Sequence, residues 1–445
     1  MPKHIFRSTF AALAISFVLC LSAYAAEPAK PPEGFTVLFN GRDFSGWHGM
    51  GHFDLRKLAA LSDDERAKKR AEDMQDLKQH WKIENGELVN DGKGVYMTTD
   101  KDYGDMEFLI EYKLIPKGDS GIYLRGTPQV QVWDFNEEAG YWKHGADKGS
   151  GGLWNNSPES PGKFPLVFAD RPIGFWNSFR IRQLGDKTTV WLNDKLVVDS
   201  VPLENYYEKS QPLFAKGPIQ LQTHGNEVRW RNIAIREISS HEANALLRGN
   251  NDPEGFVKVF NGQDFTGWTG PVENYEVKDG SIVCKPGLGG TIHTKDEYDD
   301  FIVRLEFKLP PAGNNGLAIR YSGSGEPAYT GMCELQVLDT EHPSYAKIDP
   351  RQAHGSAYGM VPAHRGYLRP TGQWNYEQAT VKGSKVKVEL NGVTILDADL
   401  AKVTEFMANT PHPGKDRKSG YFGLAGHSDP VEFRNIAIKR LNSSK

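Results

Sequence analysis

The sequence lacks most features that mark metal-binding, membrane-spanning or nucleic-acid-binding proteins. Its 445 residues include three cysteines, with no CxxC motif and no cysteine–histidine cluster, which excludes the usual structural zinc sites. The net charge of -4 gives no indication of a nucleic-acid partner. Beyond the first 26 residues, no apolar run is long enough to span a membrane. Cys284 and Cys333 lie beyond that segment and could form a disulfide or remain two buried thiols.

The first residues have the features of an export signal. Lys3 and Arg7 precede an apolar run from Phe10 to Leu21, and Ala23-Tyr24-Ala25 resembles a cleavage site. We therefore predict a signal peptide over residues 1–26, cleaved after residue 25 or 26. The mature protein is then expected to be periplasmic or secreted.

The rest of the chain contains the same domain twice. Residues 34–47 read GFTVLFNGRDFSGW and residues 255–268 read GFVKVFNGQDFTGW, with nine of fourteen positions identical. The segment RNIAIREI at 231–238 matches RNIAIKRL at 434–441. A period of roughly 200 residues is too long for a solenoid and indicates a tandem duplication of one globular domain. We predict a first domain over residues 27–240, a linker over 241–253 and a second domain over 254–445.

Each copy has the pattern of an antiparallel β protein. The alternating segments at 107–114 and 302–309 both stop at a proline. In each copy a hairpin turn, Asn193-Asp194 or Asn391-Gly392, separates two apolar runs. The 46 glycines suit frequent turns, and aromatic residues at 11% suit a sugar-binding surface. The expected fold class is all-β, with two tandem sandwiches.

One charged stretch interrupts this pattern in the first copy. Residues 54–80 contain no Gly or Pro and are rich in Ala, Leu, Lys, Glu and Arg. Ser62 followed by Glu65 resembles a capping box, so we predict a helical insertion. Such a helix could pack on the sandwich edge as a solvated element, or it could form a lid or a partner surface.

Alignment of the two copies exposes matched polar positions. GDSGIYLR at 118–125 matches GNNGLAIR at 313–320, and TPQVQVWD at 127–134 matches MCELQVLD at 332–339. Side chains two residues apart on a strand share a face, so Gln129 and Gln131 lie on one face, as do Glu334 and Gln336. These pairs could line a concave site. The matched pairs are Arg125 with Arg320, Gln129 with Glu334, Gln131 with Gln336, and Asp134 with Asp339.

Two further segments add aromatic and histidine side chains. GGLWNNSP at 151–158 matches GSAYGMVP at 355–362, which pairs Trp154 with Tyr358 as possible platforms for a sugar ring. LQTHG at 221–225 matches LAGHS at 424–428 and pairs His224 with His427, whereas His354 has no counterpart. Structural roles stay open: the arginines could bind carboxylates within the fold, the aspartates could cap turns, and the histidines could be structural.

Together these motifs resemble the 3-keto-disaccharide hydrolase family, also called domain of unknown function 1080. The resemblance covers roughly residues 34–238 and 255–441. It includes the G-F-x-x-x-F-N-G-x-D-F-x-G-W opening, the turns at Trp81–Gly86 and Tyr275–Gly280, the strand that ends in Arg, the E-x-Q-V-L-D strand, the W-N segments and the final H-G…FRNI run. It implies concanavalin A-like jelly rolls, exported by bacteria, that act on glycosides oxidised at C3.

The implied reaction is elimination followed by hydration. A ketone at C3 acidifies the hydrogen on C2, so a general base can remove it while a cationic donor stabilises the enolate oxygen. The aglycone then leaves C1, and water adds to the enone. An ordinary glycosidase would instead use a pair of carboxylates, for which Glu334 and Asp339 are the candidates. These two residues are five apart on one strand and would point to opposite faces, which counts against that reading.

Neither copy matches the family pattern fully. The second keeps the family glutamate as Glu334, whereas the first has Gln129, which cannot act as a base. The second replaces the Q-x-H-G of Gln222–Gly225 by Ala425-Gly426-His427-Ser428. For the second copy the resemblance implies Glu334 as base, Arg320 and His427 as donors, Tyr358 or His354 as orienting groups, and Gln336 and Asp339 as substrate contacts. For the first it implies a sugar held by Arg125, Gln129, Gln131, Asp134, Trp154, Gln222 and His224.

We therefore expect an exported hydrolase of 3-keto-glycosides, with a non-catalytic tandem carbohydrate-binding protein as the alternative. The expected partner is a carbohydrate, and no cofactor is required. The acidic loop Asp296–Asp300 is compatible with a weak Ca²⁺ site, although turn chemistry explains it better.

Overall fold

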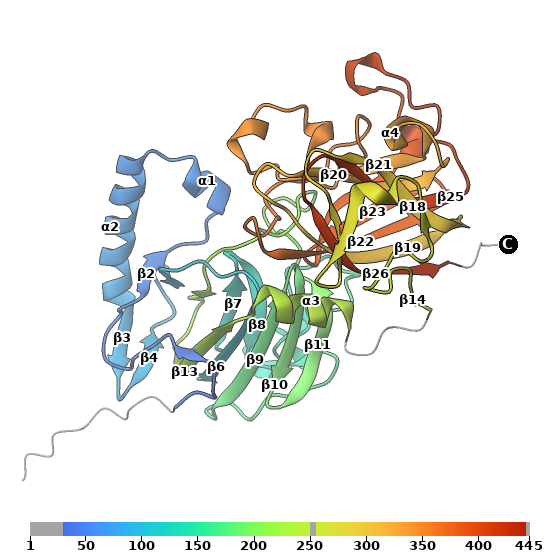
Figure 1. Ribbon diagram of the computed structural model, residues 1–445. Coiled ribbons are helices and arrows are strands. Elements are labelled where there is room, and N and C mark those ends of the chain that lie inside the picture. The colour runs from blue at the N-terminus through green and yellow to red at the C-terminus, as the bar shows by residue number, and fades with distance from the viewer. Residues whose placement is uncertain (1–29, 250–254, 442–445) are drawn as a thin grey trace, which may run out of the picture.

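The computed structural model describes residues 30–249 and 255–441 (Figure 1). The predicted signal peptide, residues 1–26, lies outside these ranges. The chain forms two sandwich units, the first coloured blue to green in Figure 1 and the second yellow to red. Each unit pairs an eight-stranded antiparallel sheet with a five-stranded one, which confirms the all-β tandem fold.

In the first domain the large sheet has the order β11-β10-β9-β6-β13-β4-β3, and β1 also pairs with β13. The small sheet has the order β2-β5-β12-β7-β8. The large-sheet strands are β1 (Thr36–Val37), β3 (Trp81–Glu84), β4 (Glu87–Asn90), β6 (Met106–Leu114), β9 (Asn177–Leu184), β10 (Lys187–Leu192), β11 (Lys195–Pro202) and β13 (Val228–Glu237). The small-sheet strands are β2 (Trp47–Met50), β5 (Tyr96–Thr99), β7 (Asp119–Leu124), β8 (Thr127–Trp133) and β12 (Gln220–Leu221).

The second domain repeats this strand order. Its sheets run β24-β23-β22-β19-β26-β17-β16, with β14 on β26, and β15-β18-β25-β20-β21. The large-sheet strands are β14 (Val257–Lys258), β16 (Tyr275–Lys278), β17 (Ser281–Cys284), β19 (Phe301–Lys308), β22 (Trp374–Lys382), β23 (Lys385–Leu390), β24 (Val393–Asp399) and β26 (Glu432–Arg440). The small-sheet strands are β15 (Trp268–Thr269), β18 (Gly289–Tyr298), β20 (Asn314–Tyr321), β21 (Cys333–Leu338) and β25 (Gly420–His427).

The core of each domain lies between its two sheets and follows from strand alternation. In β6, every second side chain from Met106 to Leu114 is buried in one hydrophobic cluster. The tryptophan of each repeated GW motif belongs to the core of its domain. The indole N–H of Trp47 donates to the Leu38 carbonyl, and that of Trp268 donates to the Val259 carbonyl, both at 2.7 Å. The repeated motif therefore fixes the chain entry in the same way in both domains.

The predicted helical insertion is present as α1 (Leu55–Ala59) and α2 (Asp63–His80). Ser62 and Glu65 form the expected capping box at the start of α2. Asp76 accepts from the Val95 backbone N–H at 2.6 Å, and Leu77 is fully buried. The helix thus packs beside β2 and β5, at the left of Figure 1.

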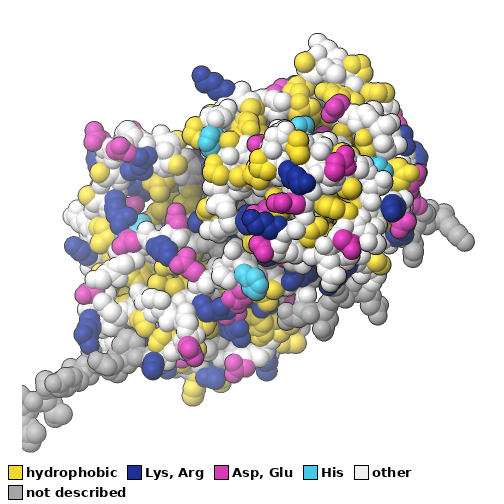
Figure 2. All heavy atoms as spheres, viewed as in Figure 1, with side chains coloured by type: hydrophobic (Ala, Val, Ile, Leu, Met, Phe, Trp, Pro, Cys, Tyr) yellow, Lys and Arg dark blue, Asp and Glu magenta, His cyan; other side chains and the backbone are white. Residues whose placement is uncertain are grey.

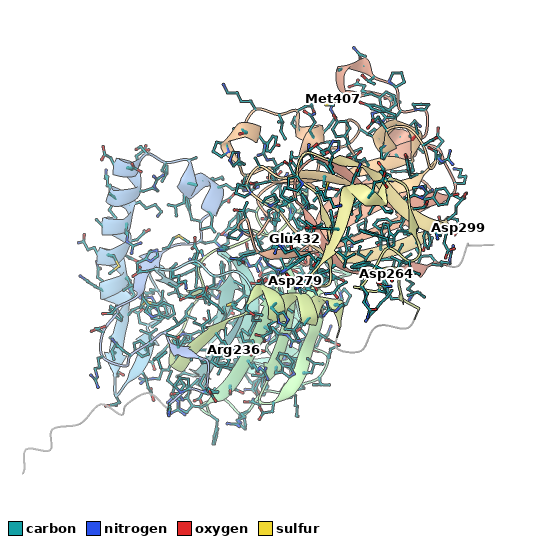
Figure 3. All side chains as sticks on the ribbon, viewed as in Figure 1. Arg236, Asp264, Asp279, Asp299, Met407 and Glu432 are labelled. Atoms are coloured by element: carbon teal, nitrogen blue, oxygen red, sulfur yellow. The ribbon has the colours of Figure 1, made fainter. Side chains whose placement is uncertain are left out.

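A third helix, α3 (Ser240–Arg248), lies in the segment between the two domains (Figure 1). Arg236 of β13, labelled in Figure 3, donates to Glu242 at 2.7 Å. At the other end of the helix, Arg248 donates to Glu306 of the second domain at 2.5 Å. The segment predicted as a linker therefore contains a helix that contacts both domains through ion pairs.

Cys284 and Cys333 are both buried and both free, so the structure has two thiols rather than a disulfide. Of the helices in the two described ranges, none is long and apolar enough to cross a membrane.

Candidate functional site

The candidate site lies on the outer face of the small sheet in the second domain. On β20, Leu317 and Ile319 enter the core, which leaves Gly316 and Ala318 on the opposite face. The neighbouring β25 contributes Gly423 and Ala425 to the same face, paired with Ala318 and Gly316. These small residues leave space beside the polar side chains of β21.

A pocket of about 300 Å³ opens at one end of this face. It combines carboxylate, amide, imidazole and phenol groups with a few apolar side chains, a mixture suited to a sugar. Its lining residues are Asn314, Glu326, Ala328, Tyr329, Glu334, Gln336, Leu338, Tyr345, Ile348, Gln352, Tyr358 and His427.

Glu334 and His427 form the charged pair of this pocket. His427 Nε2 lies 3.6 Å from Glu334 Oε1, and their side chains are 42% and 6% exposed. The Glu334 carboxylate raises the pKa of His427 despite partial burial, so the imidazolium persists to higher pH than usual. Gly316 is required beside this pair, because a Cβ there would overlap Glu334 Oε1.

Amide and phenol groups extend the pocket on either side of Glu334. Gln336 donates to Asn314 Oδ1 at 2.6 Å, and this bond fixes the Gln336 amide. Gln352 donates to the Tyr358 hydroxyl at 3.2 Å, and the Tyr358 ring is half-buried. These groups can bind hydroxyls around the carboxylate.

Three residues that the sequence placed at this site lie elsewhere. Arg320 is fully buried and donates to Gly383 O, Arg417 O and the Asp300 carboxylate at 2.8 to 2.9 Å. His354 lies in the interior, with Nε2 3.0 Å from buried Glu377. Asp339 accepts from the Ala312 N–H at 2.9 Å, so it stabilises a turn. None of these three lines the pocket around Glu334.

The first domain has a related but different arrangement. Gln129, the counterpart of Glu334, donates to Gln131, which donates to Asp119 Oδ1 at 2.8 Å. The other Asp119 oxygen lies 2.9 Å from His224 Nδ1, and this hydrogen bond raises the pKa of His224. Each domain therefore pairs its histidine with one carboxylate. The carboxylate belongs to β7 in the first domain and to β21 in the second.

The remaining predicted residues of the first domain are spread over its surface and interior. Arg125 is buried and donates to Phe214 O at 2.9 Å, and Asp134 accepts from the Lys117 N–H at 2.7 Å. Trp154 is half-buried, and its indole N–H donates to His144 O at 3.0 Å. Gln222 lies beside Gln129, because a Cβ at Gly121 would meet the oxygens of both amides.

The sequence comparison missed Asp119 and its counterpart Asn314. Both stand two residues before the glycine that faces Glu334 or Gln129, so strand alternation could have placed them on the same face. Tyr329 and Gln352 were also missed, because they reach the pocket from two short helices, α4 (Pro327–Thr330) and η6 (Pro350–Gln352), which share no strand register with Glu334. No group of three or more His, Cys, Asp or Glu suited to a metal occurs in the described part of the chain.

Comparison with known proteins gives one family over both halves of the chain. The domain described as 3-keto-alpha-glucoside-1,2-lyase-like matches residues 34–236 and 255–439. A 3-keto-disaccharide hydrolase from Bacteroides thetaiotaomicron is 26% identical over 232 residues, 43% of this chain and 80% of that protein.

Solved structures similar to this chain match it over less than half its length. A candidate glycosyl hydrolase from Parabacteroides distasonis is 26% identical, with a TM-score of 0.37, over 42% of this chain and 95% of that one. The carbohydrate-binding module CBM66 from Bacillus subtilis is 15% identical, with a TM-score of 0.27, over 40% of this chain and 97% of that one. Because the family match extends over both sandwich domains, the chain belongs to the 3-keto-alpha-glucoside-1,2-lyase-like family and contains two copies of its domain.

Proposed function

We propose that the second domain cleaves glycosides whose sugar carries a ketone at C3. The observation that carries this proposal is the Glu334–His427 pair inside a polar pocket. A single carboxylate beside a cationic donor is what proton abstraction next to a ketone requires. The family membership and the 3-keto-disaccharide hydrolase relative support the same substrate class.

The reaction begins when Glu334 takes the proton from C2 of the sugar. The C–H electron pair forms an enolate with the C3 oxygen, and the imidazolium of His427 donates a hydrogen bond to that negative oxygen. The enolate then collapses, which restores the ketone, forms a C1–C2 double bond and breaks the bond from C1 to the aglycone oxygen. Protonated Glu334 returns its proton, directly or through water, to the leaving oxygen, and addition of water across the double bond, OH to C1 and H to C2, gives net hydrolysis.

The other pocket residues orient the sugar around this pair. Gln336 is held by Asn314, and Tyr358 is held by Gln352, so both present their polar groups in fixed positions. Such fixed contacts lower the entropic cost of placing C2 against the carboxylate.

A tandem sugar-binding protein without catalysis is the second candidate. The observation that favours it is Gln129, which occupies the position of Glu334 in the first domain and cannot accept a proton as a base. This candidate requires that unoxidised sugar binds and that no sugar is cleaved.

Product analysis by mass spectrometry separates the two candidates. The mature protein is incubated with a 3-keto-disaccharide and, separately, with its unoxidised parent. Cleavage of the oxidised sugar alone supports the proposed reaction, because the parent has no acidified C2 hydrogen. Saturable binding without cleavage of either sugar would favour the second candidate.

We further propose that the protein is exported, as the N-terminal sequence indicates. The supporting pattern is the basic start, apolar run and Ala23-Tyr24-Ala25 segment. N-terminal sequencing of the protein from its native host is expected to begin at residue 26 or 27. A mature chain that retains Met1 would contradict this proposal.

A further inference from the structure

On the outer face of the first domain, the buried amide oxygens of Gln129, Gln220 and Gln222 lack a partner within the described part of the chain, and those of Gln129 and Gln222 lie close together. Gln129 Oε1 and Gln222 Oε1 accept no hydrogen bond from any residue that the structure describes. A Cβ built on Gly121 would lie 2.6 Å from the first oxygen and 3.1 Å from the second. The two acceptors therefore converge above one glycine. A buried acceptor without a partner destabilises the fold, and a bound hydrogen-bond donor would satisfy it.

The orientation of these amides follows from Asp119. Its carboxylate can only accept, so the Gln131 NH₂ group must point to it, at 2.8 Å. The Gln131 oxygen then faces Gln129 and accepts from the Gln129 NH₂ group. Gln129 Oε1 is left facing the glycine. The unpartnered acceptor is thus fixed by a relay that starts at a charged group.

This face is poorly suited to abstract a proton from a sugar. Asp119 uses one oxygen for Gln131 and the other for His224, at 2.8 and 2.9 Å. At the positions where the second domain has Ala318, Gly423 and Ala425, the first domain has Tyr123, Gln220 and Gln222. The two faces therefore differ in shape, and the first domain has polar and aromatic side chains at the positions that are small beside Glu334.

Aromatic side chains continue the same face beyond Gly121. Tyr123 lies two residues further along β7, its hydroxyl lies 3.0 Å from His52 Nδ1, and its ring lies 5.3 Å from Tyr96. The His52 ring lies 5.2 Å from that of Tyr206, which is 42% exposed.

The insertion helps to build this aromatic region. His52 lies between β2 and α1, and Arg56 of α1 donates at 2.5 Å to Glu208, in the loop that carries Tyr206. Between its GW strand β15 and β16, the second domain has only the short 3-10 helix η4 (Val272–Asn274) and no counterpart of α1 and α2. The aromatic region is therefore particular to the first domain.

We propose that the first domain binds a neutral, unoxidised oligosaccharide and does not cleave it. Sugar hydroxyls donate to Gln129 Oε1 and Gln222 Oε1, and they reach these oxygens after a small rotation of the half-buried Gln222 side chain. The next sugar ring packs on Tyr206 and His52. A ketone oxygen has no proton to donate, so the two acceptors favour a hydroxyl over a ketone. On the face of the molecule that Figure 2 shows, acidic and basic side chains are interspersed, with no large patch of one sign.

The test is a calorimetric titration in which maltotriose, as the probe sugar, is added to the full chain. The chain carries Glu334→Gln so that the proposed cleavage in the second domain is removed. We expect one saturable binding event. It should weaken at least tenfold in Gly121→Ala, which crowds both amide oxygens, and in Tyr206→Ala, which removes an exposed ring without a change to the core. The matched change in the second domain, Gly316→Ala, should leave the affinity unchanged.

Two results would overturn this inference. One is the absence of saturable binding of maltotriose. The other is binding that is lost in Gly316→Ala but retained in Gly121→Ala and Tyr206→Ala, which would place the sugar in the second domain. Cleavage of 3-keto-disaccharide by the unmodified chain is measured separately, so failure of either proposal leaves the other testable.

Discussion

At the residue scale, the two domains differ most in where they place one carboxylate. The second domain has Glu334 on β21 and the neutral Asn314 on β20, whereas the first has Gln129 on β8 and Asp119 on β7. In both, the carboxylate lies within 3.6 Å of the matched histidine. The exchange leaves a carboxylate that lines the pocket in the second domain, and in the first a carboxylate whose two oxygens are bonded to Gln131 and His224.

Replacement of Glu334 by Gln should lower kcat on a 3-keto-disaccharide about 10²- to 10⁴-fold, because loss of a general base has that effect. The side-chain volume is kept, so thermal unfolding should not change appreciably. Steady-state kinetics measure the effect, and Glu276→Gln, at an exposed position of β16, serves as the control. Full activity in Glu334→Gln would remove this residue from the mechanism.

The raised pKa of His427 gives a pH prediction. The histidine stays protonated above the usual value of about 6.5, and the cationic form is the donor, so kcat/KM should fall as pH rises through the raised pKa. In Glu334→Gln the partner charge is gone, and the His427 pKa should return towards the usual range. An NMR titration of the imidazole measures this directly in both proteins. An identical His427 pKa in the two proteins would contradict the assigned cause.

At the scale of elements, similar strands support two different surfaces. The strand orders of the domains match, but the first domain adds α1 and α2 between β2 and β3. Helix α2 is mostly solvated and anchored by its buried Leu77, by the bond from Val95 to Asp76, and by its capping box. Helix α2 therefore packs against the sandwich through a few contacts, and its N-terminus is stabilised locally by the capping box.

Loss of the α2 cap should loosen the helix without unfolding the sandwich. In Ser62→Ala the capping box is removed, which costs about 1 kcal/mol of local stability. Hydrogen exchange should accelerate for the amides of α2 and stay unchanged for β6 and β13. The matched control is Ser239→Ala, which removes the N-cap of α3 instead and should not affect α2.

For the whole molecule, Asp105 is a point of contact between the domains. It lies 3.4 Å from Arg125 of its own domain and 3.4 Å from Arg369 of the other, and it accepts from the Gly185 N–H at 2.8 Å. Both arginines are largely desolvated. Arg125, the matched arginine of the first repeat, thus belongs to the contact between the domains and not to the group of amides around Gln129.

Replacement of Asp105 by Ala should destabilise the molecule strongly. It leaves the buried Arg125 guanidinium without its carboxylate, a change that costs about 3–5 kcal/mol. Scanning calorimetry should show a lower unfolding temperature, with the two domains unfolding less cooperatively. Lys68→Ala, which breaks an exposed helix pair, is the control and should not shift the transition. An unchanged transition in Asp105→Ala would show that the domains are held by other contacts.

The sequence by itself determined the duplication, the all-β class, the helical insertion and the family, because these depend on local patterns that repeat along the chain. It also placed Glu334 and Gln336 on one strand face, since alternation is a local property. Only the tertiary structure decided that Arg320 and His354 lie in the interior and that Asp119 and His224 meet. Those relations join strands and loops from separate parts of the sequence, and residue spacing along one strand carries no information about them.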